Sequence, residues 1–131
     1  MQNDGGRAAD IGIISLGGCH AAVLEAVDRL RGDGKSVDYM RVRAFPFAPS
    51  IREFIESHGR CYVVEQNRDG QLRTLLAIET GIARDRMMSV LDYGGLPLTA
   101  DRVVNGVMAG ERQITSPSYA TADRSVSSLP A

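Results

Sequence analysis

The stretch Cys61–Leu72 constrains the fold of this chain more than any other part of the sequence. It begins with four apolar residues, including two adjacent valines, a pattern typical of a strand buried on both faces. Polar residues and Gly70 follow at once, and Leu72, Leu75 and Leu76 then recur at helical spacing. The stretch therefore predicts a strand, a tight turn and a helix, which is the repeating unit of an α/β protein.

Similar units recur along the chain. Apolar runs predict further strands at residues 11–16, 37–43 and 87–91, and helices at about 20–31, 51–58, 72–80 and 100–108. The alternation predicts a three-layer α/β/α fold with a mostly parallel sheet of four to five strands. The first and third strands are the least polar and are expected at the centre, which gives the order 2-1-3-4 with right-handed crossovers. The second strand carries charge at every second or third position, so it suits an edge.

Several polar residues are expected to mark helix ends. Ser50 and Glu53 fit a capping box before the second helix, and Thr99 fits an N-cap for the last. Gly81 is expected to end the third helix, as glycines commonly do. His58 lies at the end of the second helix and is predicted to be a solvated cap.

The length of 131 residues suits one domain, which we expect at 10–110. Residues 1–9 are predicted to be a polar lead-in, and residues 111–131, rich in Ser, Thr, Ala and Pro, a flexible tail. The two cysteines are too few for a four-cysteine zinc or iron–sulfur site. Cys19 follows the first strand and Cys61 begins the third, so they are expected at opposite ends of the sheet, with both thiols free.

Charge and hydropathy exclude two classes of partner. The formal net charge is −1 and no run of lysine or arginine is present, so bulk electrostatics gives no reason to expect nucleic acid or a membrane surface. No apolar run is long enough to span a membrane, and the polar N-terminus lacks a signal-peptide core. A cytoplasmic location is therefore the expectation.

The candidate site lies at the carboxyl ends of the two central strands, where α/β sheets usually dock ligands or partners. The turns after these strands are expected to face each other across a crevice. No catalytic residue and no metal ligand is assigned there. The candidate binding or interface residues are Gly17, Gly18, Cys19, Glu65, Asn67, Gly70 and Gln71.

Some of these residues have more than one interpretation. Cys19 is either a thiol activated by a helix dipole or a small residue that fits a tight turn. Glu65 either accepts hydrogen bonds from backbone N–H groups of a nearby turn or contacts a ligand or partner. Asn67 and Gln71 are expected to serve a contact outside the domain, so that alanine there leaves its stability nearly unchanged. Gly70 is expected to adopt a positive φ or to permit a close approach.

Familiar nucleotide motifs are missing. The turn Gly17-Gly18-Cys19-His20-Ala21 does not match GxGxxG, and the second strand ends on Arg41 and Arg43 where a dinucleotide site needs an acid. No Gly-Lys-Ser or Gly-Lys-Thr is present, which excludes a P-loop. A phosphorylated receiver domain needs an acidic pair after the first strand, and Leu16-Gly17-Gly18 supplies none.

The stretch Val63-Val64-Glu65-Gln66-Asn67-Arg68-Asp69-Gly70-Gln71-Leu72 resembles the VVE-x-N-x-x-G-Q-L signature in the α subunit of 2-oxoacid:ferredoxin oxidoreductases. Further pieces agree in the same order, and the resemblance covers about residues 10–108. They are the glycine turn with Ala22-Val23-Leu24-Glu25-Ala26, then Phe45-Pro46-Phe47, Glu79-Thr80-Gly81-Ile82 and Tyr93-Gly94-Gly95-Leu96-Pro97-Leu98-Thr99.

The resemblance implies the C-terminal domain of that α subunit, with the fold of the transketolase C-terminal domain. The complete enzymes of the family use thiamine diphosphate, Mg and iron–sulfur clusters to decarboxylate a 2-oxoacid, pass electrons to ferredoxin and form an acyl-CoA. Relatives usually carry Gly-Ser-Thr after the first strand, where this chain has Gly17-Gly18-Cys19. The pyrimidine-binding domain that precedes this one in the family is missing, so the chain resembles a domain fragment or a split subunit.

We therefore expect an accessory domain of an oxidoreductase of 2-oxoglutarate or pyruvate type, which serves subunit assembly and shapes a shared site. Its partners are expected to be the remaining domains or subunits, with ferredoxin for the whole complex. The isolated chain is predicted to be inactive and to hold no cofactor. The other hypothesis is a free-standing α/β module that binds a small molecule or anion through Glu65 and Asn67.

Overall fold

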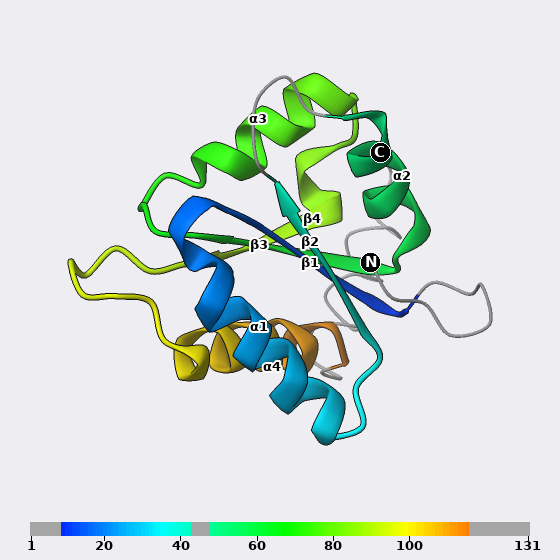
Figure 1. The fold of residues 1–131 in the computed structure, drawn as a ribbon. Helices are drawn as coiled ribbons and strands as arrows, with labels where there is room; N and C mark the ends of the chain where they lie inside the picture. Colours follow the sequence, from blue (N-terminus) through cyan, green and yellow to red (C-terminus); the bar gives the residue numbers. More distant parts are fainter. Residues whose placement is uncertain (1–8, 43–47, 116–131) are drawn as a thin grey trace, which may run out of the picture.

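The structure is a computed structural model that describes residues 9–42 and 48–115, in which strands and helices alternate (Figure 1). The strands are β1 (Ile11–Leu16), β2 (Val37–Val42), β3 (Arg60–Glu65) and β4 (Met87–Leu91). The helices are α1 (His20–Gly32), α2 (Pro49–Ser57), α3 (Gln71–Thr80) and α4 (Ala100–Thr115), with 3-10 turns η1 (Gly17–Cys19) and η2 (Arg84–Arg86).

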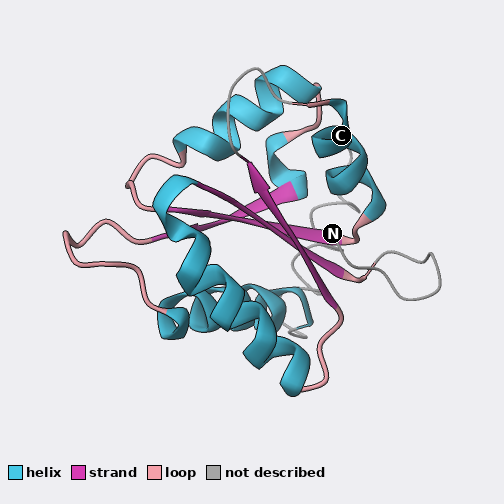
Figure 2. Ribbon diagram, in the orientation of Figure 1, coloured by secondary structure: helices cyan, strands magenta, loops and turns pink. Residues whose placement is uncertain are grey.

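The strands form one parallel sheet in the order β2-β1-β3-β4. The order predicted from strand polarity is therefore confirmed, with β1 and β3 at the centre. Helices α1 and α4 cover one face of the sheet and α2 and α3 cover the other, which gives the predicted three-layer α/β/α architecture (Figure 2).

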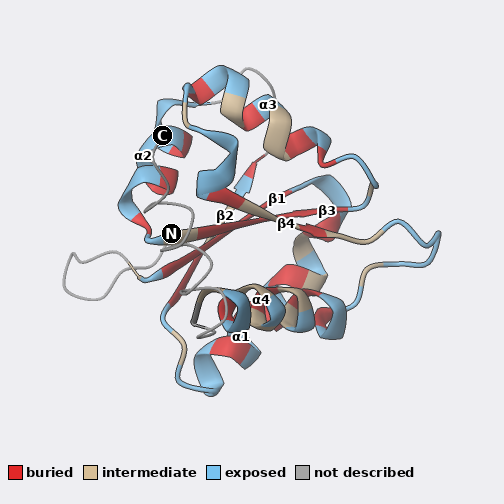
Figure 3. Cartoon of the chain, turned by 180° about the vertical axis from the view of Figure 1, so that it is seen from behind, coloured by how far each residue is buried: buried red, intermediate tan, exposed pale blue. Residues whose placement is uncertain are grey.

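The two cores follow the alternation of side chains along the central strands. Ile11 and Ile13 of β1 point into the core under α1 and α4, whereas Ile14 belongs to the core under α2 and α3. Tyr62 and Val63 of β3 divide between the same two cores. Figure 3 shows the result, with buried residues along the sheet and exposed residues on the outer sides of the helices. Burial on both faces is what the continuous apolar runs of these strands require.

Helix α4 packs unusually close to the sheet because two glycines face it. A Cβ at Gly106 would lie 2.6 Å from Val90 Cγ1, and a Cβ at Gly110 would lie 2.5 Å from Tyr62 Cε2. The next residue, Glu111, is buried and accepts hydrogen bonds from the Tyr62 hydroxyl at 2.5 Å and from Arg60 Nε at 2.7 Å. Hydrogen bonds of Glu111 thus hold the last turns of α4 against β3.

Two predicted boundaries are corrected. The capping box at Ser50 and Glu53 is wrong, because α2 begins at Pro49 with Ala48 as its N-cap and makes no side-chain cap. Proline suits the first helical position, since its fixed φ matches the helix and its missing N–H needs no partner there. Helix α4 continues to Thr115, past the predicted start of the tail at residue 111, because Glu111 has buried partners. The N-cap at Thr99 is confirmed, with its hydroxyl accepting from Arg102 N at 3.3 Å.

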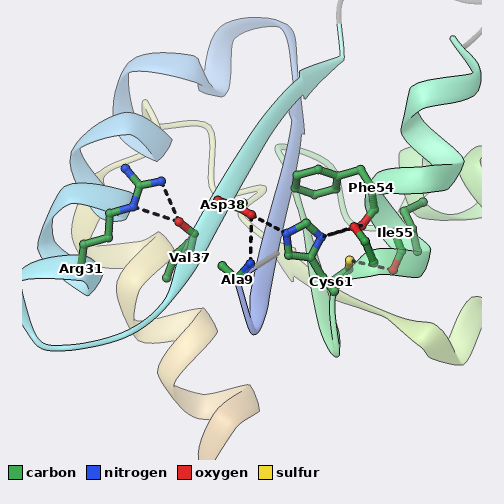
Figure 4. A network of polar contacts seen from close by, with 9 residues as sticks. Ala9, Arg31, Val37, Asp38, Phe54, Ile55 and Cys61 are labelled. Atoms are coloured by element: carbon green, nitrogen blue, oxygen red, sulfur yellow. Dashed lines mark hydrogen bonds and ion pairs between the residues drawn. The ribbon is translucent and has the colours of Figure 1, made fainter. Parts of the chain in front are cut away.

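His58 is buried, so the prediction of a solvated cap is wrong. Its Nδ1 donates to the Phe54 carbonyl at 2.6 Å and its Nε2 lies 2.8 Å from Oδ2 of Asp38 on β2 (Figure 4). Ala9 N also donates to Asp38 Oδ2. These contacts explain how the edge strand β2 buries a carboxylate, because a buried charge needs hydrogen-bonded partners.

The cysteines lie at opposite ends of the sheet, as predicted. Cys61 pairs in register with Gly12 near the start of β1, whereas Cys19 lies beyond the end of that strand. Both thiols are free and buried. Burial raises the pKa of the Cys61 thiol to about 12, which makes it an inert core residue at neutral pH.

Candidate functional site

The turns after β1 and β3 meet at the carboxyl end of the sheet. Gly17 and Gly18 are exposed in η1, and Cys19 lies buried behind them. Cys19 Sγ lies 3.9 Å from Oε1 of Gln66, the residue that follows β3. The sequence prediction that these two turns face each other is therefore confirmed.

Glu65 is the last residue of β3, is 4% exposed and caps helix α3 with its carboxylate. Its Oε1 accepts from Leu72 N at 2.6 Å, and its Oε2 accepts from Arg73 N at 3.1 Å. These N–H groups belong to the first turn of α3 and have no partner within the helix. A carboxylate at this position also interacts favourably with the helix dipole. Of the two interpretations of Glu65, the structure supports the internal cap.

Asn67 extends the same cap. Its Nδ2 donates to Glu65 Oε1 at 2.9 Å, and its Oδ1 accepts from the backbone N–H groups of Asp69 and Gln71 at 3.1 and 3.3 Å. Gly70 completes the turn with a φ of 61°, in the left-handed region that other residues adopt at a cost. The succession of a strand, an αL glycine and a helix is thus held by Glu65 at the strand end and by Asn67 in the turn.

These bonds correct one prediction. Asn67 is predicted from the sequence to serve a contact outside the domain and to matter little for stability, but it binds both a buried carboxylate and the backbone. Alanine at Asn67 is therefore no longer expected to be neutral for stability. The Gln71 side chain is exposed, and its role in an outside contact stays a prediction.

The cap also bears on the small-ligand hypothesis. A helix N-terminus is a common place for an anion because its N–H groups point outward. At α3 these groups are already bound to Glu65 and Asn67. The geometry therefore gives no support to an anion held by these two side chains.

Cys19 is not an activated thiol. Burial raises the pKa of Cys19 first, and the negative charges of Glu65 and Asp92 raise it further. The thiol is protonated at neutral pH, so it is a poor nucleophile. The structure supports its interpretation as a small residue in a tight turn.

A polar cluster beside η1 was not foreseen from the sequence. The Tyr39 hydroxyl lies 2.6 Å from Ser15 Oγ and 2.9 Å from His20 Nδ1, and the His20 and Tyr39 rings stack with their centroids 5.6 Å apart. Burial raises the pKa of Tyr39. The signal in the sequence is a serine inside the most apolar strand, because a buried hydroxyl requires a partner.

Apolar side chains are exposed near the same end of the sheet. Leu16 at the end of β1 is 43% exposed, and Leu96 between β4 and α4 is 76% exposed. Tyr93 is also exposed, with the Arg68 guanidinium 5.3 Å from its ring centroid. Such residues are consistent with a protein contact at this end.

The candidate site does not suit the cofactors of the resembled family. A diphosphate needs free N–H donors or cations, and the α3 N-terminus is occupied by a carboxylate. Cys19 and Cys61 lie at opposite ends of the sheet, so they cannot share a cluster. Within residues 9–42 and 48–115 no three histidine, cysteine or acidic side chains are grouped to hold a metal ion.

No helix among the described residues is long and apolar enough to cross a membrane.

Comparison with known proteins shows what the chain is similar to. It is 32% identical over 105 residues to subunit α of 2-oxoacid:ferredoxin oxidoreductase 2 from Aeropyrum pernix, an alignment covering 79% of this chain and 16% of the relative. The solved 2-oxoglutarate:ferredoxin oxidoreductase from Magnetococcus marinus matches with a TM-score of 0.70 and 31% identity, covering 79% of this chain and 18% of that one. The curated relatives that these comparisons give are α subunits of 2-oxoacid:ferredoxin oxidoreductases. The resemblance found in the sequence is therefore confirmed.

The transketolase-like architecture is confirmed as well. A chain of a split-gene transketolase, described as an inactive β4 tetramer, superposes with a TM-score of 0.62 at 21% identity, covering 79% of this chain and 39% of that one. No family model matches the sequence. The chain spans only about a sixth of the α subunit from Aeropyrum pernix.

Proposed function

We propose that this chain is an accessory domain of a 2-oxoacid:ferredoxin oxidoreductase that depends on thiamine diphosphate. The observation that supports this most is the 31% identity and TM-score of 0.70 to the oxidoreductase from Magnetococcus marinus, across 79% of the chain. The domain serves subunit assembly and shapes a site shared with other domains. Thiamine diphosphate, Mg and the iron–sulfur clusters are held elsewhere in the complete enzyme, and ferredoxin accepts its electrons.

The proposed contact with the rest of the enzyme lies at the carboxyl end of the sheet. Gly17 and Gly18 present exposed backbone there, Gln71 adds an exposed side chain, and Leu16 and Leu96 add exposed apolar surface. Apolar residues surrounded by polar ones are typical of a protein–protein contact. Glu65, Asn67 and Gly70 support this surface from within by fixing the turn between β3 and α3.

The test is to recover the native polypeptide from its host with a tag, identify what co-purifies, and assay reduction of a viologen dye by 2-oxoglutarate and by pyruvate. We expect the complex to reduce the dye when a 2-oxoacid and coenzyme A are supplied. The purified 131-residue chain should not reduce the dye with either 2-oxoacid. A matched pair of variants locates the contact. Leu96→Glu should weaken assembly, whereas Ile78→Glu on the exposed side of α3 should not. Turnover by the isolated chain, or equal assembly of both variants, contradicts the proposal.

A further inference from the structure

The outer edge of β4 is bordered by a groove that the candidate site does not use. Among the described residues, β4 pairs only with β3, so its other edge carries no strand. Helices α3 and α4 flank this edge from the two faces of the sheet (Figure 3). Between them runs a groove of about 910 Å³. It is lined by β4 residues together with Arg73 of α3 and Arg102, Asn105, Ala109 and Arg112 of α4.

The backbone of β4 presents hydrogen-bonding groups to this groove. Asp92 N donates to the Glu65 carbonyl at 2.9 Å, so the backbone of Asp92 faces β3. N–H and C=O groups alternate in direction along a strand, and the backbone groups of Ser89 and Leu91 therefore point to the open edge. An open edge of this kind can pair with an extended segment from another polypeptide.

The volume of the groove leaves room for side chains of such a segment. On the α4 side its wall combines longer polar side chains, such as Asn105, with the small residue Ala109. On the α3 side the Ser89 Oγ is buried and has no hydrogen-bond partner among the described residues. A buried hydroxyl without a partner is unusual in a native protein and often marks a missing one.

The charge of the groove selects the kind of segment. Three arginines line it, from both helices. Arg73 donates from Nε and Nη2 to the Arg84 carbonyl. The Nε atom of Arg102 lies 3.5 Å from Oδ1 of Asp92, and 60% of the Arg102 side chain is exposed. Guanidinium groups bind carboxylates well because several N–H donors match the two oxygens. The same charges disfavour pairing of two copies of this chain edge to edge, since the arginines would face one another.

We propose that the edge of β4 is a docking site for an extended, acidic protein segment, which adds to the sheet as a fifth strand. The segment pairs with the outward backbone groups of Ser89 and Leu91 and places carboxylates against Arg73 and Arg102. This inference goes beyond the proposed function and does not depend on it.

The experiment selects binders from a displayed library of random short peptides, using the full 131-residue chain as bait. We expect recovered peptides to carry acidic residues at alternating positions and to protect the amides of Ser89 and Leu91 from hydrogen exchange. Their affinity should fall as salt is raised, because exposed charges are screened. The variant Arg102→Glu should weaken binding about tenfold. Arg52→Glu is the matched control, since Arg52 is 58% exposed, pairs with Glu56 and does not line the groove.

A second variant tests the backbone contact separately. Ser89→Pro removes one outward N–H without touching the bonds between β3 and β4, and edge strands tolerate proline at such positions. It should abolish binding while the chain keeps its circular dichroism. If Ser89→Pro fails to fold, Arg102→Glu and hydrogen exchange still decide. Recovery of no peptide, of peptides without an acidic preference, or of peptides that bind Arg102→Glu as well as Arg52→Glu overturns the proposal, as does dimerisation of the chain through β4.

Discussion

The turn after β3 and the outer edge of β4 are neighbouring regions that use their polar groups in opposite ways. In the turn, Glu65 and Asn67 bind backbone N–H groups of the same chain. At the edge, the backbone of Ser89 and Leu91 points outward and the Ser89 hydroxyl has no partner among the described residues. The polar side chains Glu65 and Asn67 of the turn therefore stabilise the domain itself. The strand β4, which has few polar side chains, leaves backbone hydrogen-bonding groups available to a partner.

Glu65→Ala removes the carboxylate that caps α3. It leaves the N–H groups of Leu72 and Arg73 without an acceptor at a buried helix end. We expect the free energy of unfolding to fall by about 3 kcal/mol, because bonds to a charged group are strong and buried orphan donors are costly. Urea denaturation of the full chain measures it. Glu65→Gln keeps an acceptor and should lose less; equal losses for both variants would mean that the side chain acts only by filling space.

Gly110→Ala tests the wall of the groove. The added Cβ would lie 2.5 Å from the Tyr62 ring, in a helix whose next residue binds the Tyr62 hydroxyl. Overpacking of this kind destabilises by about 1–3 kcal/mol, more than alanine gains as a helix former. Gly32→Ala in α1 is the control, since nothing lies within 4 Å of its Cβ position, and it should be neutral or stabilising. Thermal melts of the pair compare them; similar melting temperatures would show that α4 moves away at little cost.

Asn67→Ala and Gln71→Ala separate the cap from the exposed surface of the same turn. Asn67 accepts hydrogen bonds from two backbone N–H groups and donates one to the Glu65 carboxylate. Its loss should cost about 1 kcal/mol, as for other helix caps. Gln71 has an exposed side chain, and its loss should change stability by less than ~0.5 kcal/mol. Denaturant midpoints decide, and a reversed order would place the cap elsewhere.

Ser89→Ala should have the smallest effect and the opposite sign. It removes a buried hydroxyl that makes no bond in the described part of the chain. The isolated chain should keep its stability or gain up to ~1 kcal/mol, because an unpaired buried polar group is unfavourable. A clear loss in urea denaturation would show that Ser89 has a partner in the chain, and the contrast between the two regions would fail.

The sheet order could be predicted because it depends on polarity summed over whole strands. β1 and β3 are the least polar of the strands, and β2 carries charges along its length as an edge strand does. The position of the turn after β3 was predictable for a similar reason, since Gly70 and the polar residues interrupt two apolar patterns. The contacts of the Glu65 carboxylate depend on where the first turn of α3 lies in space relative to the end of β3. The spacing of residues along the chain does not fix that position.

Other features depend on contacts far apart in sequence. His58 is buried beside Asp38, which lies 20 residues earlier on β2 and forms a hydrogen bond with its Nε2. Glu111 belongs to the core because Tyr62 and Arg60 reach it from β3. The sequence does carry a signal for the close approach of α4, because Gly106 and Gly110 are four residues apart and therefore share one side of a helix.

The close approach of α4 also limits which changes in chain length the domain can absorb. Gly106 packs against Val90 and Gly110 packs against Tyr62, so the helix needs a glycine at two positions with a fixed separation. A single residue inserted within the helix rotates all following residues by about 100° about the helix axis. A residue with a side chain would then take the place of one of these glycines. The segment Tyr93–Pro97 between β4 and α4 is exposed and under no such restriction. Insertions and deletions compatible with this fold should therefore gather in that segment and avoid α4.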